Sequence, residues 1–592
     1  MLFFAIEHFF ISLYFKTISI MHSIKFCFIA ICLISSIFSY AQKKEDKVLK
    51  IEGLKSSDFS GLNFRSIGPA VTSGRVSDFA VNPKNHSEYY VATASGGVWK
   101  TENKGLTFTP IFDGEGSYSI GCITLDPSNA KTVWVGSGEN NNQRSVAYGD
   151  GVYKSEDGGA SWKNMGLSKS EHIAEIIVHP SNSNIVYVAA YGPVWSEGGE
   201  RGVYKSIDGG KTWVNVKSVS SFTGCNDLVM DPRDPNILYA AFHQRMRKVY
   251  TYIGGGPESA VYKSTDGGTT WSKIEGGLPK GDLGRIGIAI SKVNPDVLYA
   301  IVEAKEKSGG IYKSEDKGVS WVKKSGTYTS GNYYNEIECD PIDVNKIYIT
   351  DTYYKVSFDG GATVKNLGEN NKHIDNHAIW VNPTNGNHMI VGCDGGIYET
   401  YDHAKTWDFK SNLPITQFYK VSTDNAKPFY GVHGGTQDNL SLGGPSRTTS
   451  ANGITNSDWY VTSLGDGFET QVDPSNENIV YAQAQYGALT RFDRLSGEYL
   501  FIKPIEGESD EALRWNWDAP LLISQFNHKR LYFGANKVFR TDDQGNSWKV
   551  ISPDLSRGLD RNKFEVMGRV WSVDGIAKNQ STDIYGQTTS IA

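Results

Sequence analysis

The stretch that decides the fold begins at Val152 and reads VYKSEDGGASW. Close copies open at Val203 (VYKSIDGGKTW), Val261 (VYKSTDGGTTW) and Ile311 (IYKSEDKGVSW). Their shared core is S/T-x-D-x-G-x-S/T-W. Copies this similar at separated positions exclude chance and indicate an internal repeat.

Weaker copies of this core extend the repeat along the chain: VWKTENKGLTF from Val98, VSFDGGATV from Val356, IYETYDHAKTW from Ile397 and VFRTDDQGNSW from Val538. The alternating Val-Tyr-Lys-Ser predicts a strand, and Asp-Gly-Gly predicts a tight turn in which Gly takes a positive φ. The Asp carboxylate can accept backbone N–H groups inside that turn, and the Trp opens the next strand. We therefore expect a structural role for the repeated aspartates: Asp157, Asp208, Asp266, Asp316, Asp359, Asp402 and Asp543.

A second signature is a corner followed by a buried strand. Examples are DPSNAKTVWVGSG from Asp126, HPSNSNIVYVAA from His179, DPRDPNILYAAF from Asp231 and DPSNENIVYAQA from Asp473. Measured from corner to corner, the chain contains ten units spaced 42 to 60 residues apart. Four antiparallel strands in about 40–50 residues form a propeller blade. The predicted fold class is therefore all-β, built from β-propeller blades.

Composition agrees with short strands and narrows the class of partner. The 592 residues include 63 Gly, 32 Tyr and 14 Trp, and the formal net charge is −6. No dense Lys/Arg run is present, so neither nucleic acid nor an anionic membrane surface is an expected partner.

The N-terminus predicts a secretory signal peptide over residues 1–41. Lys25 supplies a short basic region, residues 26–38 an apolar core, and Ser39-Tyr40-Ala41 a cleavage site. We expect Met21 to be the true start and the mature chain to begin at Gln42, which predicts a secreted, periplasmic or cell-surface protein. No later stretch approaches the ~18 apolar residues of a membrane span.

Four widely spaced cysteines remain after this segment: Cys122, Cys225, Cys339 and Cys393. Without a CxxC pair, we expect four buried thiols on strands, with a disulfide or a metal site as the alternatives. We predict no cofactor and no metal.

The repeated boxes and corners resemble the Asp-box (BNR repeat) propellers of sortilin-type (VPS10) receptors and of xyloglucanases. The resemblance runs from about Leu62 to the end of the chain. It implies either a single ten-bladed propeller, as in the sortilin-like module, or two seven-bladed propellers with a substrate cleft between them, as in the xyloglucanase-like enzymes.

The spacing of the boxes favours two propellers. The box is absent from the two units after Trp407. The sequence pattern also changes after Leu413, to PITQFYKV and then to the Gly-rich VHGGTQDNLSLGG. We expect a linker at 42–61, a seven-bladed propeller at 62–422 and a partial second propeller at 423–592. The final GQTTSIA, residues 586–592, would be the inner strand of an unfinished eleventh blade in a truncated chain.

Candidate site residues follow from the same corner-to-corner spacing. The entry to each innermost strand lies seven residues before its corner, where the chain places Arg75, His172, Asp375, Gln417, Asp466 and Asp518. In KHIDNHAIW, alternation on a strand would put His373, Asp375 and His377 on one face. Such a set suits a hydrogen-bonded cluster, a divalent metal or acid–base chemistry.

Two loops add polar ligand-binding candidates. The first, GSGENNNQRSVAYGDG from Gly136, offers carboxylate, amide, basic and aromatic groups: Glu139, Asn140, Asn141, Arg144, Tyr148 and Asp150. Corresponding loops add Trp195 and the basic HQRMRK run from His243. The second loop, GGTQDN, offers Gln437, Asp438 and Asn439 near the expected junction between propellers.

The xyloglucanase resemblance implies two catalytic carboxylates, because glycoside hydrolysis uses an acid and a base or nucleophile. The family's R-T-D-x-G-G stretch corresponds here to ATASGG, with Ala94 in the Asp position. The family's G-D-x-G strand entry corresponds to LGDGFET and places Asp466 there. Asp375 or Glu139 would have to replace the missing carboxylate.

The expected function is therefore binding of a xyloglucan- or β-glucan-like polysaccharide in a cleft between propellers, with hydrolysis left open. The alternative is a sortilin-like module that binds a peptide or protein without catalysis.

Overall fold

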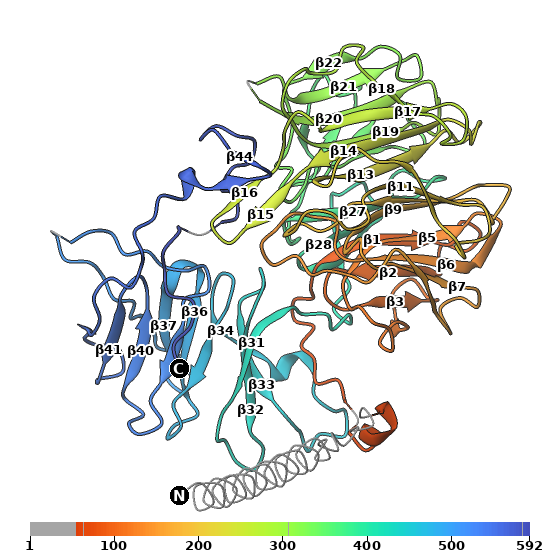
Figure 1. Cartoon of the computed structure of the whole chain (residues 1–592). Helices are drawn as coiled ribbons and strands as arrows, with labels where there is room; N and C mark the ends of the chain where they lie inside the picture. Colours follow the sequence, from red (N-terminus) through yellow and green to blue (C-terminus); the bar gives the residue numbers. More distant parts are fainter. Residues whose placement is uncertain (1–54, 63, 306, 509, 583) are drawn as a thin grey trace, which may run out of the picture. The chain divides into compact units, whose positions relative to one another are not determined.

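The computed structural model describes residues 55–592 except 63, 306, 509 and 583 (Figure 1). The expected signal peptide and most of the expected linker lie outside the described residues. The chain divides into a first unit, residues 1–66, and a second unit, residues 67–592. The described part of the first unit contains the short 3-10 turn η1 (Ser56–Phe59).

The second unit is built from strands. Its first seven sheets each contain four antiparallel strands. The first sheet comprises β1 (Val76–Val81), β2 (Tyr89–Thr93), β3 (Val98–Thr101) and β4 (Thr109–Pro110). The second comprises β5 (Ile120–Asp126), β6 (Asn129–Ser137), β7 (Val152–Ser155) and β8 (Lys163–Gly166). The third comprises β9 (Ile173–Val178), β10 (Val186–Ala190), β11 (Gly202–Ser206) and β12 (Val214–Lys217).

The fourth sheet comprises β13 (Thr223–Met230), β14 (Leu238–Gln244), β17 (Ala260–Ser264) and β18 (Ser272–Lys273). The fifth comprises β19 (Leu283–Ile290), β20 (Leu298–Ala304), β21 (Gly310–Ser314) and β22 (Val322–Ser325). The sixth comprises β23 (Ile337–Cys339), β24 (Ile347–Ile349), β25 (Lys355–Ser357) and β26 (Lys365–Asn366). The seventh comprises β27 (Asn376–Val381), β28 (Met389–Cys393), β29 (Gly396–Thr400) and β30 (Asp408–Phe409).

Three further four-stranded sheets follow. The eighth comprises β31 (Phe418–Thr423), β32 (Gly431–Thr436), β33 (Ser441–Pro445) and β34 (Tyr460–Ser463). The ninth comprises β35 (Thr470–Val472), β36 (Ile479–Ala484), β37 (Ala488–Asp493) and β38 (Tyr499–Phe501). The tenth comprises β39 (Leu521–Ile523), β40 (Leu531–Gly534), β41 (Val538–Thr541) and β42 (Lys549–Val550).

Two small hairpins and three 3-10 turns complete the described regular structure. The hairpins are β15 (Met246–Lys248) with β16 (Thr251–Ile253), and β43 (Glu565–Val566) with β44 (Arg569–Val570). The turns are η2 (Asn456–Asp458), η3 (Gln485–Gly487) and η4 (Arg561–Lys563). The all-β architecture of repeated four-stranded sheets predicted from the repeat is confirmed. In the described part of the chain, no helix has the length and apolar character needed to span a membrane.

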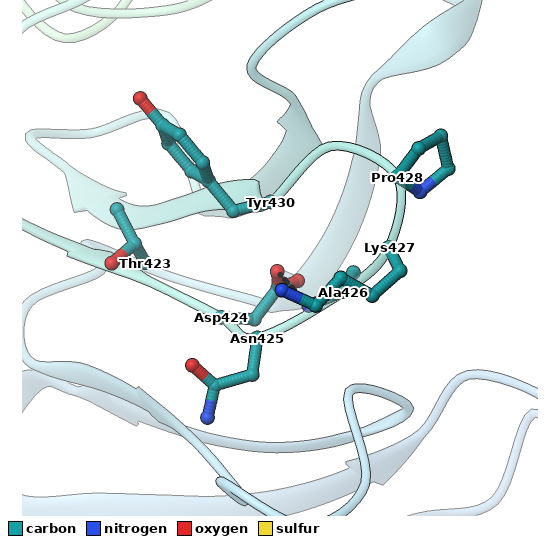
Figure 2. Close-up of a pocket in the computed structure, with 7 residues that line it drawn as sticks. All are labelled: Thr423, Asp424, Asn425, Ala426, Lys427, Pro428 and Tyr430. Carbon is teal, nitrogen blue, oxygen red and sulfur yellow. Dashed lines mark hydrogen bonds between the residues drawn. The ribbon is translucent and has the colours of Figure 1, made fainter.

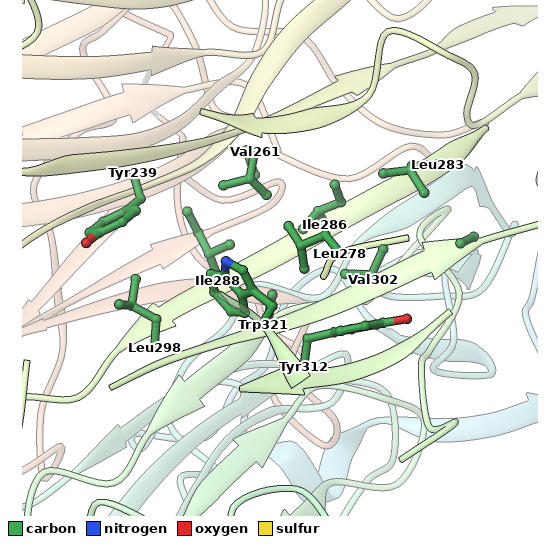
Figure 3. Close-up of a cluster of buried hydrophobic side chains, with 13 residues drawn as sticks. Tyr239, Val261, Leu278, Leu283, Ile286, Ile288, Leu298, Val302, Tyr312 and Trp321 are labelled. Atoms are coloured by element: carbon green, nitrogen blue, oxygen red, sulfur yellow. The ribbon is translucent and has the colours of Figure 1, made fainter. Parts of the chain in front are cut away.

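Apolar side chains hold neighbouring sheets face to face. Between the fourth and fifth sheets, Tyr239 and Val261 meet Ile288, Leu298 and Trp321 in one buried cluster (Figure 3). Repeating this contact from sheet to sheet buries each apolar face against the next and supplies the main stabilising term.

The seventh sheet packs back on the first. The innermost strand β27 contacts β1, and Val76 and Val91 share a buried cluster with Ile390 and Ile397. In the remaining sheets, β31 packs on β35 and β35 on β39. From this packing we propose that the first seven sheets form a closed propeller and the last three belong to a second, partial ring. The strand β31 straddles the boundary expected between 422 and 423 and pairs with β32, so we place the proposed boundary before Phe418.

The repeated aspartates all lie in the turn of the last hairpin of a sheet and share one bonding pattern. In the second sheet, Asp157 Oδ1 accepts the Ser155 hydroxyl at 2.8 Å and the Ser161 N–H at 2.9 Å, while Oδ2 accepts the Ser161 hydroxyl at 2.6 Å. These bonds lower the pKa of Asp157 to about 2. Some box tryptophans bond the preceding sheet, as when Trp213 Nε1 donates to the Met165 carbonyl at 2.8 Å, whereas Trp271 and Trp321 donate to carbonyls of their own turns.

The four cysteines of the described part are free thiols, and each lies on a strand. Three are buried, and Cys339 is half-buried.

The C-terminal residues differ from the expected inner strand of an eleventh blade. Residues 586–592 form no strand, although the Thr588 N–H donates to the Ala535 carbonyl of the tenth sheet at 2.8 Å. Just before them, the β43–β44 hairpin lies beside β15 and β16 (Figure 1), where Val566 and Trp571 pack on Met246 and Ile253.

Candidate functional site

A buried arginine at the entry to β1 organises the strongest polar cluster. Arg75 Nε lies 2.7 Å from Asp394 Oδ1, and Nη1 lies 2.9 Å from Glu139 Oε1. Its Nη2 lies 3.2 Å from Asp438 Oδ2 and also bonds the Tyr333 hydroxyl. The guanidinium thus joins the first, second and seventh sheets to the loop between β32 and β33 of the eighth.

Asp394 is a site residue that the sequence reasoning missed. It occupies the β28–β29 turn of the seventh sheet, where its N–H donates to the Asp375 carbonyl at 3.0 Å. Ala94 occupies the same turn of the first sheet and donates in the same way to the Arg75 carbonyl at 3.0 Å. The carboxylate absent at Ala94 is therefore present at the equivalent turn of the neighbouring sheet. Burial would raise the pKa of Asp394, but Arg75 and His377 hold that pKa well below its ordinary value.

The KHIDNHAIW segment reaches this cluster by a different geometry from the one expected. The strand β27 begins only at Asn376, and Asp375 takes a left-handed φ of 63°, so alternation along a strand does not align His373, Asp375 and His377. His377 Nε2 lies 2.9 Å from Asp394 Oδ1. Asp375 Oδ1 accepts the Tyr334 hydroxyl, and burial with repulsion from Asp394 raises its pKa.

His373 makes a different set of contacts from the other two residues. Its Nδ1 lies 2.8 Å from the Ile374 carbonyl, and its ring borders Gly395. Among the described residues, no group of three or more His, Cys, Asp or Glu side chains has metal-binding geometry.

Two aspartates from the eighth and ninth sheets complete the cluster. Asp438 and Asp466 share a hydrogen bond, and Asp438 also bonds Asp394. Burial raises the pKa of both carboxyls, and repulsion by Asp394 adds to this effect. One proton shared between the two carboxyls forms the hydrogen bond that joins them. The pair can therefore both accept and donate hydrogen bonds at near-neutral pH. We call Arg75, Glu139, Asp394, Asp438 and Asp466 the junction cluster.

The loop that carries Asp438 is conformationally strained. Asp438 has φ 61° and Leu440 has φ 76°, a region that non-glycine residues rarely adopt. Asn439 holds the loop against the seventh sheet by donating to the Asp394 carbonyl at 2.9 Å. Gln437 Oε1 accepts the Ser145 hydroxyl at 3.4 Å. Strain of this kind concentrates at functional sites.

Two aromatic side chains, Tyr486 and Trp517, lie near the residues that interact with Asp466. Gln485 Nε2 donates to Asp466 Oδ1 at 2.9 Å, and the next residue, Tyr486, is 44% exposed. The ring of Tyr486 lies 5.1 Å from that of Trp517, edge to face. The Arg144 guanidinium lies 3.9 Å above the Trp517 ring. Neither aromatic was selected from the sequence, because neither belongs to a box or a corner.

The Asn-rich loop after β6 is held in place by hydrogen bonds of Glu139. Glu139 Oε1 accepts Asn141 Nδ2 at 2.5 Å, and the Glu139 carbonyl lies 2.7 Å from His172 Nδ1. Asn140 is half-buried in the same loop. Trp195 lies apart from the junction cluster, since its contacts are with Arg247 and Lys248.

A pocket of about 500 Å³ lies elsewhere, in the corner between β31 and β32 (Figure 2). Its carboxylate, Asp424, accepts the Ala426 N–H at 3.0 Å and lies 2.9 Å from His433 Nε2. These bonds account for Asp424 as a corner-forming residue, so the junction cluster remains the better candidate site.

Comparison with known proteins agrees with the expected resemblance. A family model described as "Sortilin, neurotensin receptor 3" matches residues 150–278. A xyloglucanase of Hypocrea jecorina is 27% identical over 235 residues, which is 34% of this chain and 26% of that protein. A xyloglucanase of a Paenibacillus species is 24% identical over 223 residues, 33% of this chain and 20% of that protein. The chain thus spans about a quarter or less of these relatives.

Among solved structures, the GH74 xyloglucanase from Xanthomonas campestris aligns with a TM-score of 0.49 at 14% identity, covering 82% of this chain and 80% of that one. The resemblance to Asp-box propellers of the sortilin and xyloglucanase types is confirmed.

Proposed function

We propose that this chain binds a polysaccharide of the β-glucan type, with xyloglucan as the first candidate, at the junction cluster. The observation that carries the proposal is the Asp438–Asp466 carboxyl pair, which Gln485 contacts. The exposed aromatic residue Tyr486 follows Gln485 in the chain. Carboxyl groups hydrogen-bond sugar hydroxyls, and aromatic rings cover the apolar faces of pyranose rings. The similarity to xyloglucanases over a third of the chain supports this ligand class. A polysaccharide ligand fits the secreted or cell-surface location expected from the N-terminus.

Hydrolysis makes a stricter demand on geometry than binding does. Retaining glycosidases hold their two carboxyls about 5–5.5 Å apart, and inverting ones about 6.5–9.5 Å apart. Asp438 and Asp466 are hydrogen-bonded to each other and are therefore too close for either arrangement. Asp394 is committed to Arg75, so it supplies no mobile proton. We infer that the chain in its present form binds the polysaccharide without the two-carboxylate cleavage used by glycosidases.

A binding panel of immobilised xyloglucan, mixed-linkage β-glucan and cellulose, with α-glucan as the control polysaccharide, tests the ligand class. We expect retention on xyloglucan or mixed-linkage β-glucan and none on α-glucan. Equal retention on all polysaccharides, or on none, would contradict the proposal.

The Ala94→Asp variant tests the hydrolysis argument, because it restores a carboxylate in the first-sheet turn. Release of reducing ends by Ala94→Asp but not by the wild-type chain is the expected result.

A second candidate function rests on the sortilin-type match to residues 150–278. That segment contains the third and fourth sheets and their loops, and includes Trp195, which is 40% exposed. A peptide ligand would bind there and not at the junction cluster. The two functions differ in their response to Asp466→Asn: the affinity for a peptide would be unchanged, whereas the affinity for a glycan would fall.

A further inference from the structure

Four buried arginines lie in or next to the third, fourth and fifth sheets, outside the junction cluster. Arg201 precedes β11, Arg245 and Arg247 lie in the β14–β15 segment, and Arg285 lies in β19. Their exposed fractions are 4%, 0%, 1% and 1%. The HQRMRK run, expected from the sequence to be a basic loop, is therefore an interior feature.

Neutral oxygens, not carboxylates, take up most of this charge. Arg245 donates to the Asn141 and Gly192 carbonyls at 3.1 and 2.8 Å. Arg247 donates to the Asn142 and Ser581 carbonyls at 3.1 and 3.0 Å. Arg201 likewise donates to carbonyls of its own loop, at 2.5 to 3.1 Å. Within the described residues, the one ion pair made by these four arginines joins Arg285 to Glu336.

Several donors in this region also lack an acceptor. Arg245 Nε, Arg285 Nε and Nη1, and the Tyr252 hydroxyl are buried without a hydrogen-bond partner among the described residues. Arg245 and Arg285 each interact electrostatically with Tyr252, so the orphaned donors belong to one region. A buried donor without an acceptor is costly, and a buried charge without a counter-charge is more so.

Apart from Glu336, neighbouring acids offset little of this positive charge. Burial raises the pKa of Glu303 to about 7 and that of Asp227 to about 8, so a large fraction of each carboxyl is protonated and uncharged at neutral pH. Glu171 faces Arg201 and Arg245 but is only partly buried, and burial raises its pKa too. The interior therefore carries excess positive charge and excess donors at the same place.

We propose that Arg245, Tyr252 and Arg285 bind a small free oxyanion, phosphate or sulfate, enclosed by the β14–β15 connection, the β15–β16 hairpin and β19. Residues 576–582 cover this region. The Gly254 N–H donates to the Ile576 carbonyl at 3.1 Å, and the Asn579 N–H donates to the Tyr252 carbonyl at 3.0 Å. The three binding side chains are at most 1% exposed, so the proposed ligand is a small oxyanion that is not attached to a larger molecule.

The bound oxyanion also has a consequence for the proposed glycan site. Arg245 and Arg247 bond the backbone of Asn141 and Asn142, in the loop that holds Glu139 and Arg144. An oxyanion that neutralises the charge of these arginines would therefore stabilise that loop in its observed conformation.

The test uses the full chain, dialysed into chloride buffer. Thermal unfolding is followed as sodium phosphate or sodium sulfate replaces chloride at constant ionic strength, and ion chromatography of the acid-denatured protein measures any oxyanion that co-purified. The variants are Tyr252→Phe and Arg285→Met. The control is Arg233→Met, which removes an exposed guanidinium paired with Asp231 and Asp296.

We expect a saturable rise in Tm with phosphate or sulfate in the wild-type chain and in Arg233→Met, and about one oxyanion released per chain. The Tyr252→Phe chain should show a smaller rise while being no less stable than wild type in chloride, because the change removes an orphaned hydroxyl. This variant carries the test even if Arg285→Met does not fold. Identical Tm values in chloride, phosphate and sulfate, with no oxyanion released, would overturn the proposal. The phosphate and sulfate arms identify which oxyanion binds.

Discussion

At the residue scale, Arg75 is the side chain on which the candidate site depends. One guanidinium neutralises carboxylates that arrive from three separate sheets, Glu139, Asp394 and Asp438. Its bonds to Asp394 use both Nε and Nη2, the two-point geometry that favours Arg over Lys. Removing this charge leaves a group of buried carboxylates to repel one another.

Arg75→Met is therefore expected to lower the free energy of unfolding by roughly 3–5 kcal/mol, the usual cost of breaking a buried pair from one side. Urea denaturation measures the change. Arg540→Met is the matched control, because Arg540 pairs with Asp542 at the surface and its loss should cost under about 1 kcal/mol. A loss for Arg75→Met no larger than that of the control would show that the cluster does not depend on this ion pair.

The sequence predicted several members of this cluster because they lie at a fixed distance from a corner or in an unusual loop. Asp466 came from the strand-entry position, and Glu139 and Asp438 came from Asn- and Gly-rich loops. Asp394 was not selected because positions were counted from the corners to the entries of the innermost strands, whereas Asp394 lies in the turn after the second strand of its sheet. Aligning GCDGGIY with ATASGGVW on their shared Gly-Gly, with a one-residue gap after Asp394, would have found it.

At the element scale, the box hairpin is a self-contained unit that tolerates limited change. The first sheet carries Asn103 in place of the aspartate, yet Asn103 Oδ1 still accepts the Thr101 hydroxyl at 3.0 Å and the Thr107 N–H at 2.9 Å. The turn therefore requires an oxygen at this position more than a charge.

Asp157→Ala is expected to lower Tm, since it leaves the Ser155 hydroxyl and the Ser161 N–H without their acceptor. Asp157→Asn should lower Tm less, as the natural Asn103 turn indicates. Differential scanning calorimetry of the two variants measures both effects, and glycan affinity should be unchanged in each. Equal losses for Ala and Asn, or a loss of affinity at unchanged Tm, would refute a structural role.

The innermost strands carry a second kind of repeated group, carboxyls that face one another. Asp78 of β1 and Asp227 of β13 each accept an N–H from a later sheet, that of Ile123 at 2.8 Å and that of Ile288 at 2.7 Å. Burial raises their pKa values from 3.8 to about 7 and about 8, and repulsion from Glu336 and Glu338 adds to the shift. These carboxyls therefore retain their protons in the folded chain at pH values where the unfolded chain has lost them.

Because the folded state binds more protons, the free energy of unfolding should fall as pH rises from about 4 to about 8. The groups are half-buried, so we expect a total of roughly 1–3 kcal/mol over that interval and not the full shift. Urea denaturation at pH 5 and pH 8 measures it. In Asp78→Asn/Asp227→Asn the difference between the two pH values should shrink. A double variant with the wild-type pH dependence would assign that dependence to other groups.

The sheets themselves were predictable because each repeats a box or a corner. The hairpins β15–β16 and β43–β44 were not: the first is inserted between two strands of the fourth sheet, the second follows the tenth sheet, and neither carries a box or a corner. Their apolar residues, Met246 and Trp571 among them, meet only through folding across more than 300 residues. Contacts of that range leave no local pattern in the sequence.

At the scale of the whole molecule, the proposed division into two rings rests on the packing of β27 against β1. A fragment of residues 67–417 contains all seven sheets of the proposed first ring and no strand of the eighth. We expect this fragment to unfold in one cooperative transition by circular dichroism and to lack glycan binding. Loss of cooperative unfolding would contradict a closed first ring and favour a single ring of all the sheets.

The account's central claim is that Asp438 and Asp466, brought together from two different sheets, bind a β-glucan. Isothermal titration calorimetry with xyloglucan oligosaccharides on the wild-type chain, Asp466→Asn and Asp113→Asn tests it most directly. Asp113 is an exposed carboxylate between β4 and β5 and controls for the loss of one negative charge. We predict an affinity roughly ten- to a hundredfold weaker for Asp466→Asn, the effect of losing a hydrogen bond to a charged group, with Tm and the Asp113→Asn affinity unchanged. Unaltered affinity in a folded Asp466→Asn chain would contradict the claim.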